Sequence, residues 1–268
     1  MRTVVHLSDL HFGRVNPAIL APLQAFVRQV APELVCVSGD LTQRARTKEY
    51  LAAREFLRGI PFPQIVVPGN HDVPLRNPFN RFVKGLTGYK QYITADLQPS
   101  FIDEEIAVVG VNTARALTWK NGRINSGQLE RLRRRFEHVG SDHIKIVVTH
   151  HPFDLPAGAE GEVVGRSRAA IKTLAQCGVD MLLAGHFHIA DTGYTAKRYN
   201  IAGFSALIVS SGTTTSTRGR GHPNSLNVIK VARLHVVIDR YTWRPETNLF
   251  DLLSSESFQQ TPKGWIRE

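Results

Sequence analysis

Residues 66–72 read Val66-Val67-Pro68-Gly69-Asn70-His71-Asp72. An apolar strand pattern ends there in a turn with three side chains that can bind a metal ion or transfer a proton. Four other apolar runs also end in Asp, His or Asn, within residues 4–11, 34–40, 144–151 and 181–188. In open sheets covered by helices, ligands bind at the carboxyl ends of the strands. We therefore expect the five strand ends to meet at one site.

Helices are expected between these strands. Apolar residues recur at helical spacing over residues 17–30, and further helices are predicted over residues 47–59, 126–139 and 167–177. Beyond residue 190, short apolar runs follow one another with no helix pattern between them. These runs predict a second, largely antiparallel sheet.

This order of elements predicts an α/β fold, a four-layer α-β-β-α sandwich of two mixed sheets with helices outside. We expect a single domain over residues 1–268, with a motif-bearing part at 1–190 and a mostly β part at 191–268. Residues 74–100 interrupt the pattern with glycine, proline and aromatic residues. They are expected to form an insertion of loops and short helices that flanks the site and shapes the substrate.

Composition indicates a folded protein with an anionic partner. The 268 residues carry a formal charge of +10, and 42% of them are hydrophobic, which is enough for a buried core. Nucleotides, nucleic acids and acidic membranes are the partners that this charge fits. Cys36 and Cys177 lie in or beside apolar runs, so we expect buried free thiols in a reducing compartment. The chain begins on a strand pattern without an apolar run of about 18 residues, so a soluble cytoplasmic protein is expected.

The side chains at the strand ends form a mixed oxygen and nitrogen donor set. It consists of two carboxylates, four imidazoles and one amide oxygen, from Asp9, His11, Asp40, Asn70, His150, His186 and His188. This set suits Mn²⁺, Fe²⁺/Fe³⁺ or Zn²⁺ better than copper or Ca²⁺. It has too many donors for one tetrahedral zinc ion but fits two ions that share a bridging carboxylate. Two such ions clamp a phosphoryl group and lower the pKa of a bridging water, which predicts phosphoester hydrolysis.

The motifs also follow a fixed order along the chain: Asp9-x-His11, Gly39-Asp40, Gly69-Asn70-His71-Asp72, His150 and Gly185-His186-x-His188. In this order they resemble the calcineurin-like metallophosphoesterase family, over residues 9–188. The resemblance implies the two-sheet sandwich and hydrolysis of phosphodiester bonds by a metal-bridging hydroxide. Within that family, the turn at residues 69–72 and the single-domain length are most similar to the class III cyclic-nucleotide phosphodiesterases.

The resemblance implies a role for each motif residue. The first ion would be bound by Asp9, His11 and His188, the second by Asn70, His150 and His186, and both by Asp40. His71 would stabilise or protonate the leaving-group oxygen, and Asp72 would orient His71, because a carboxylate fixes the tautomer of a histidine. Asn70 thus belongs to both the metal-binding and the catalytic residues. His151 is expected to face the core or to lie behind the ligands.

Arginines near these motifs are candidates for binding the substrate phosphate, because a guanidinium matches phosphate oxygens bidentately. They are Arg44 and Arg46, just after Asp40, and Arg218 and Arg220, in a glycine-flanked loop. A solvated basic loop is the alternative for the second pair. The arginines at 131–135 are expected on the solvent face of a helix, with a membrane or nucleic-acid patch as the minor interpretation.

The leading functional hypothesis is a dinuclear-metal phosphodiesterase that hydrolyses a cyclic nucleotide such as 3′,5′-cAMP. A second is a pyrophosphatase acting on UDP-2,3-diacylglucosamine in lipid A synthesis, although typical hydrolases of that group carry Arg where this chain has His71. A repair-type DNA nuclease is less favoured, because its usual capping and coiled-coil segments are absent from this sequence. The alternative from another class is a non-catalytic scaffold of the same fold, although degenerate members lose ligands that this chain keeps.

Overall fold

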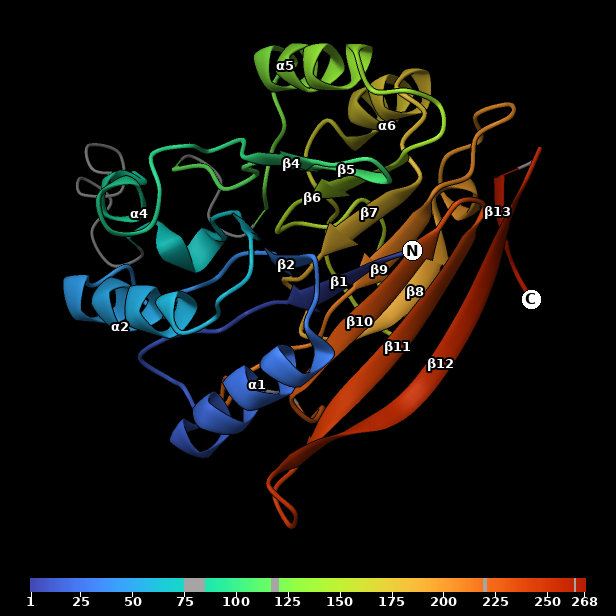
Figure 1. Ribbon diagram of the computed structural model, residues 1–268. Coiled ribbons are helices and arrows are strands. Elements are labelled where there is room, and N and C mark those ends of the chain that lie inside the picture. The colour runs from blue at the N-terminus through green and yellow to red at the C-terminus, as the bar shows by residue number, and fades with distance from the viewer. Residues whose placement is uncertain (75–84, 117–120, 219–220, 263) are drawn as a thin grey trace.

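The computed structural model describes residues 1–74, 85–116, 121–218, 221–262 and 264–268. Two mixed β-sheets pack face to face, and helices cover their outer faces (Figure 1). The expected α/β sandwich of two mixed sheets is therefore confirmed.

The first sheet contains seven strands in the order β13-β12-β11-β10-β1-β2-β3. Its parallel strands are β1 (Arg2–Leu7), β2 (Leu34–Val37) and β3 (Gln64–Val66). Its antiparallel strands are β10 (Ser225–Ala232), β11 (His235–Arg244), β12 (Leu249–Thr261) and β13 (Gly264–Arg267). β10 pairs with β1, and this antiparallel pairing joins the two groups of strands.

The second sheet contains six strands in the order β4-β5-β6-β7-β9-β8. Its inner strands run parallel to one another and are β5 (Ile106–Gly110), β6 (Ile144–Val148), β7 (Met181–Ala184) and β9 (Leu207–Ser210). Its antiparallel edge strands are β4 (Ser100–Ile102) and β8 (Asp191–Tyr194). The five sequence motifs therefore follow β1, β2 and β3 of the first sheet and β6 and β7 of the second.

The prediction of a separate antiparallel sheet after residue 190 is wrong for the described chain. β8 and β9 extend the second sheet, whereas β10–β13 extend the first. β1 and β7 would otherwise each leave a row of unpaired backbone groups, which β10 and β9 satisfy. Apolar alternation predicts that a segment is a strand, but it does not say which open edge the strand joins.

The four predicted helices are confirmed to within a few residues. α1 (Pro17–Val30) and α2 (Thr47–Arg58) pack on the first sheet, and α5 (Ser126–Glu137) and α6 (Ser167–Gln176) pack on the second. The shorter helices are α4 (Thr87–Tyr92), η1 (Asn70–Asp72) and η2 (Thr195–Lys197). α4 lies in the predicted insertion, of which residues 75–84 lie outside the described chain. No described helix is both long and apolar enough to span a bilayer.

Three apolar layers hold the sandwich together. The middle layer lies between the sheets and includes Val4, Cys36, Ile146 and Leu183. The two outer layers lie between each sheet and its helices. Cys36 is a buried free thiol, as expected, whereas the free thiol of Cys177 is partly exposed. Burial of these layers stabilises the strands whose carboxyl ends carry the motif residues.

Candidate metal centre

The loops after β1, β2 and β7 hold the motif residues in a sparsely populated backbone conformation. Asp9, His11, Asp40, His186 and His188 all have positive φ angles, from 49° to 77°. Residues other than glycine rarely adopt this left-handed region, and those that do cluster at functional sites. These five motif residues make up half of the ten described non-glycine residues with positive φ, and they follow strands of both sheets.

One group of donors consists of Asp9, His11 and His188, all buried. Nε2 of His188 lies 3.2 Å from Nε2 of His11 and 3.2 Å from Oδ1 of Asp9. Burial disfavours the charged form of Asp9, but His188 and His11 outweigh burial and hold the pKa of this carboxyl well below its usual range. Oδ1 of Asp9 has no hydrogen-bond partner within the described chain. A charged oxygen and two imidazole nitrogens thus converge on one point.

A second group consists of Asn70, His150 and His186. Oδ1 of Asn70 lies 3.1 Å from Nε2 of His150 and 3.0 Å from Nδ1 of His186, and the two nitrogens are 3.2 Å apart. Burial, and then His150, lowers the pKa of His186 to about 3. At neutral pH its imidazole is therefore uncharged, the form that binds metal ions. His151 packs beside this group, with its ring centroid 4.6 Å from that of His186 and its Nδ1 2.7 Å from Oγ1 of Thr113.

Asp40 lies between the two groups. Its Oδ2 is 3.7 Å from Nε2 of His11, and its Oδ1 is 3.4 Å from Nε2 of His150. Burial raises the pKa of Asp40, but His150, His71 and His11 outweigh burial and lower it below its usual value. An ionised carboxylate with one oxygen directed at each group has the position that a bridging ligand needs.

Backbone carbonyls orient two of the imidazoles through their other ring nitrogen. Nδ1 of His150 lies 2.8 Å from the carbonyl oxygen of Ser38, and Nδ1 of His188 lies 2.9 Å from that of Arg218. Each contact favours the tautomer that carries its proton on Nδ1, so that Nε2 is unprotonated, the form that binds a metal ion. The sequence did not single out either carbonyl, because no side-chain pattern marks a backbone acceptor.

Gln43 and Arg218 orient His71. Nδ1 of His71 lies 2.8 Å from the carbonyl oxygen of Gln43, and Nε2 lies 3.2 Å from Nη1 of Arg218. Nη1 of Arg218 also donates to Oε1 of Gln43 at 3.3 Å. Burial is the main cause that lowers the pKa of His71, and Arg218 adds to it. Gln43 was not predicted as a site residue, and its only signal in the sequence is its place three residues after Asp40.

The expected contact between Asp72 and the ring of His71 is not present. The carboxylate of Asp72 instead accepts hydrogen bonds of 2.8–3.1 Å from the backbone N–H groups of Leu41, Thr42 and Gly69. The two side chains are adjacent in a 3₁₀ turn, which directs neighbouring side chains differently. Burial, and then Asp40, raises the pKa of Asp72 to about 6. Asp72 therefore ties the loop after β2 to the turn after β3.

Of the candidate substrate arginines, Arg218 contacts a residue of the site. Arg46 is half exposed, and its Nε lies 4.0 Å from Oε1 of Glu49 at the start of α2. Arg44 is partly buried, and its backbone N–H donates to the same glutamate. Arg220 lies outside the described residues.

Gly69 leaves no room for a side chain beside Asp40. A Cβ at this position would lie 2.1 Å from Oδ1 of Asp40 and 2.4 Å from its backbone nitrogen. The φ of Gly69 is −102°, an ordinary value, so the conflict is steric. We expect Gly69→Ala to displace Asp40 and to weaken Mn²⁺ binding by about 10- to 100-fold, the effect of disturbing a ligand's support. Titration calorimetry measures the change.

Gly193→Ala is the matched control, because a Cβ there meets no atom within 4 Å. This variant should bind Mn²⁺ as the wild type does. Unchanged Mn²⁺ affinity in Gly69→Ala would contradict the position of Asp40 in the metal centre.

These residues fit two metal ions. A group formed by Asp9, Asp40 and His150 also has its ligand atoms within 4.8 Å of one another, so the two donor groups are continuous. Asp9 and Asp40 are buried carboxylates whose pKa values are lowered, and buried charges of one sign require a cation nearby. The oxygen and nitrogen donors suit Mn²⁺, iron or Zn²⁺.

Comparison with known sequences agrees with this geometry. A family model described as calcineurin-like phosphoesterase matches residues 2–190. A glycerophosphodiester phosphodiesterase of Enterobacter lignolyticus is 32% identical over 80 residues, which cover 26% of this chain and 29% of that protein. A protein named a probable cyclic nucleotide phosphodiesterase, from Synechococcus, is 24% identical over 209 residues, which cover 70% of this chain and 74% of that protein.

Among solved structures, a purple acid phosphatase from yellow lupin has a similar fold. Its TM-score is 0.71 at 14% sequence identity, over 96% of this chain and 53% of that chain. At this identity the similarity concerns the fold alone. The family model, in contrast, covers well over half of the chain and every donor residue from Asp9 to His188. The chain therefore belongs to the calcineurin-like phosphoesterase family.

Proposed function

We propose that the protein is a metal-dependent phosphodiesterase with a dinuclear centre. The observation that carries this proposal is the position of Asp40, whose two oxygens lie 3.7 Å and 3.4 Å from histidines of the two donor groups. One ion would be bound by Asp9, His11 and His188, the second by Asn70, His150 and His186, and both by Asp40. Mn²⁺ or iron is proposed for these positions, with Zn²⁺ as the alternative.

The chemistry that two such ions supply when bound is charge stabilisation on the phosphoryl group and a lowered pKa for water. The fold positions the donor side chains and excludes water from them, because Asp9, His11 and His150 are fully buried. The ring of His71 lies at the edge of this centre, 5.0 Å from the ring of His11. A leaving oxygen that reaches Nε2 of His71 also reaches the guanidinium of Arg218, 3.2 Å away. Proton transfer and fixed positive charge would thus act at the same oxygen.

A small phosphodiester is the proposed substrate, and a cyclic nucleotide is the leading candidate. The Synechococcus relative named a probable cyclic nucleotide phosphodiesterase supports it, because the match covers 70% of this chain. A glycerophosphodiester is the second candidate, supported by 32% identity over 80 residues with a glycerophosphodiester phosphodiesterase. Arg218 would bind the substrate phosphate in either case, and the net charge of +10 favours an anionic substrate.

Hydrolysis assays with the Mn²⁺-loaded protein test the function and distinguish the substrates. They compare cyclic AMP, glycerophosphocholine and UDP-2,3-diacylglucosamine, with an Asp40→Ala variant as the control. We expect cyclic AMP to be hydrolysed by the wild type and not by the variant. Turnover of one of the other compounds alone would assign that substrate class instead. No turnover with Mn²⁺, iron or Zn²⁺ would overturn the proposal in favour of a scaffold.

A further inference from the structure

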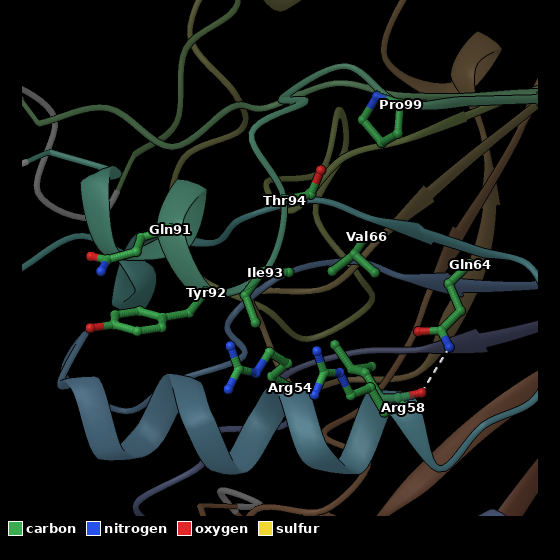
Figure 2. Close-up of a pocket in the computed structure, with 10 residues that line it drawn as sticks. Arg54, Arg58, Gln64, Val66, Gln91, Tyr92, Ile93, Thr94 and Pro99 are labelled. Carbon is green, nitrogen blue, oxygen red and sulfur yellow. Dashed lines mark hydrogen bonds between the residues drawn. The ribbon is translucent and has the colours of Figure 1, made fainter.

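A pocket of about 500 Å³ lies between α2, β3 and the segment after α4 (Figure 2). It is separate from the metal centre. Gln64 and Val66 of β3 line the pocket, and Val66 lies four residues before Asn70 in the sequence. None of the proposed metal ligands lines this pocket.

Two arginines from one face of α2 line the pocket. Figure 2 shows the guanidinium groups of Arg54 and Arg58 extending from the helix in the same direction, toward Ile93. Neither side chain has a hydrogen bond or an ion pair with another residue, as far as the structure describes the chain. Nε of Arg54 is buried and lacks an acceptor. None of the described residues that line the pocket is acidic.

Both features are unfavourable without a ligand. Like charges four residues apart on a helix repel each other, and water screens this repulsion only in part, since Arg58 is exposed but Arg54 is partly buried. A buried donor that lacks an acceptor has lost its bond to water without replacement. An anion between Arg54 and Arg58 would relieve both effects, and the planar fork of each guanidinium matches two oxygens of a phosphate group.

The other residues that line the pocket indicate the kind of organic group that carries the anion. Val66, Ile93 and Pro99 form an apolar part of the lining. Both hydrogen bonds from Nε2 of Gln64 go to backbone carbonyls, those of Leu57 and Ile60, so its Oε1 is left to accept a hydrogen bond from a ligand. A phosphate ester that carries a hydroxyl and a short apolar portion meets all three requirements.

We propose that this pocket is an anion-binding site for the phosphate group of a small phosphate ester. Two sources offer the same chemistry, namely a soluble organic phosphate and the headgroup of an anionic phospholipid. The site does not depend on the phosphodiesterase reaction, because its residues lie outside the metal centre.

Phosphate binding to charge-matched variants tests the site. Equilibrium dialysis with radiolabelled inorganic phosphate compares the Mn²⁺-loaded wild type with Arg54→Gln/Arg58→Gln and with Arg133→Gln/Arg244→Gln. The second pair removes the same charge at half-exposed arginines of α5 and β11. We expect the wild type and the control to bind one more phosphate per chain than the Arg54/Arg58 variant, whose affinity at this site falls about ten-fold or more.

Hydrolysis of bis-p-nitrophenyl phosphate should be equal in all three proteins, since their metal centres are identical. Failure of that activity in all of them would therefore concern the proposed function and not the pocket. Equal numbers of bound phosphates in the three proteins would overturn the anion site.

Two further measurements distinguish a soluble organic phosphate from the headgroup of an anionic phospholipid as the ligand. Displacement of the extra phosphate by glycerol 3-phosphate would identify a soluble ester. Weaker binding of Arg54→Gln/Arg58→Gln than of the control to vesicles of phosphatidic acid and phosphatidylcholine would identify a lipid headgroup. Vesicles of phosphatidylcholine alone should bind neither variant.

Discussion

Replacing Asp40 with alanine is expected to lower phosphodiesterase activity by more than about 100-fold. Loss of a residue that only supports a metal ligand costs up to about 100-fold, and loss of the ligand itself should cost more. Asp40 is buried and directs one oxygen to each donor group. Its Oδ1 also accepts a 2.8 Å hydrogen bond from the backbone N–H of His71. Alanine removes the bridging ligand, a negative charge and the acceptor that holds His71. Metal analysis should show fewer than two ions per chain, and hydrolysis of bis-p-nitrophenyl phosphate should fall in parallel.

Two further variants separate loss of the bridge from loss of the fold. Asp40→Asn keeps one carbonyl oxygen in the same volume, so it should retain more metal than the alanine variant. Asp239→Ala removes another buried carboxylate, which lies on β11, two strands away from β1, and bonds to Lys230 and Ser255. It should lower the thermal stability but leave the metal content unchanged. Two bound ions and full activity in Asp40→Ala would exclude the bridging role.

The sequence predicted the positions that depend on local rules. Asp9 and Asn70 were recognised because each follows an apolar strand, and the carboxyl ends of such strands meet in this type of fold. The extent of α1 followed from another local rule, the helical spacing of apolar residues over 17–30, and in the structure Asn16 caps the helix by accepting a hydrogen bond from the backbone N–H of Ala18.

Contacts between distant segments were not predictable in this way. Arg218 and Gln43 are 175 positions apart, yet the guanidinium of one bonds to the amide of the other beside His71. Arg218 was a candidate for binding phosphate because it lies in a glycine-flanked basic loop, and no sequence pattern pointed to Gln43. The same limit applies to β9 and β10, which the pattern identified as strands without indicating which sheet each would join.

Adjacency in sequence was also misleading at Asp72. A carboxylate next to a histidine suggested a direct pair, but the side chain turns toward the backbone of Leu41 and Thr42. Those N–H groups lie in a buried loop and need acceptors, and a carboxylate that accepts several backbone hydrogen bonds is well satisfied there. The carbonyl oxygen of Gln43 then takes the place beside Nδ1 of His71.

His71→Ala is expected to reduce turnover while both metal ions stay bound. Its ring contacts Gln43 and Arg218, and neither of its nitrogens forms a hydrogen bond to one of the proposed ligands in the described structure. For an alkyl phosphodiester such as cyclic AMP, whose leaving alkoxide is strongly basic, kcat should fall by about 10²- to 10⁴-fold, the usual contribution of a positioned acid or base. His138→Ala, at an exposed histidine after α5, is the control and should be fully active.

The leaving group decides between the two roles open to His71. p-Nitrophenolate departs without a proton, so bis-p-nitrophenyl phosphate should lose little activity in His71→Ala if the imidazole transfers a proton. Electrostatic stabilisation would instead slow both substrates, because charge develops on the leaving oxygen in each case. Burial and Arg218 lower the pKa of His71, which makes a proton on Nε2 unfavourable before substrate binds. Arg218, which stays charged at all relevant pH values, would then provide much of the stabilisation, and Arg218→Gln should slow both substrates alike. Full activity of His71→Ala toward both substrates, with two ions bound, would remove His71 from the reaction.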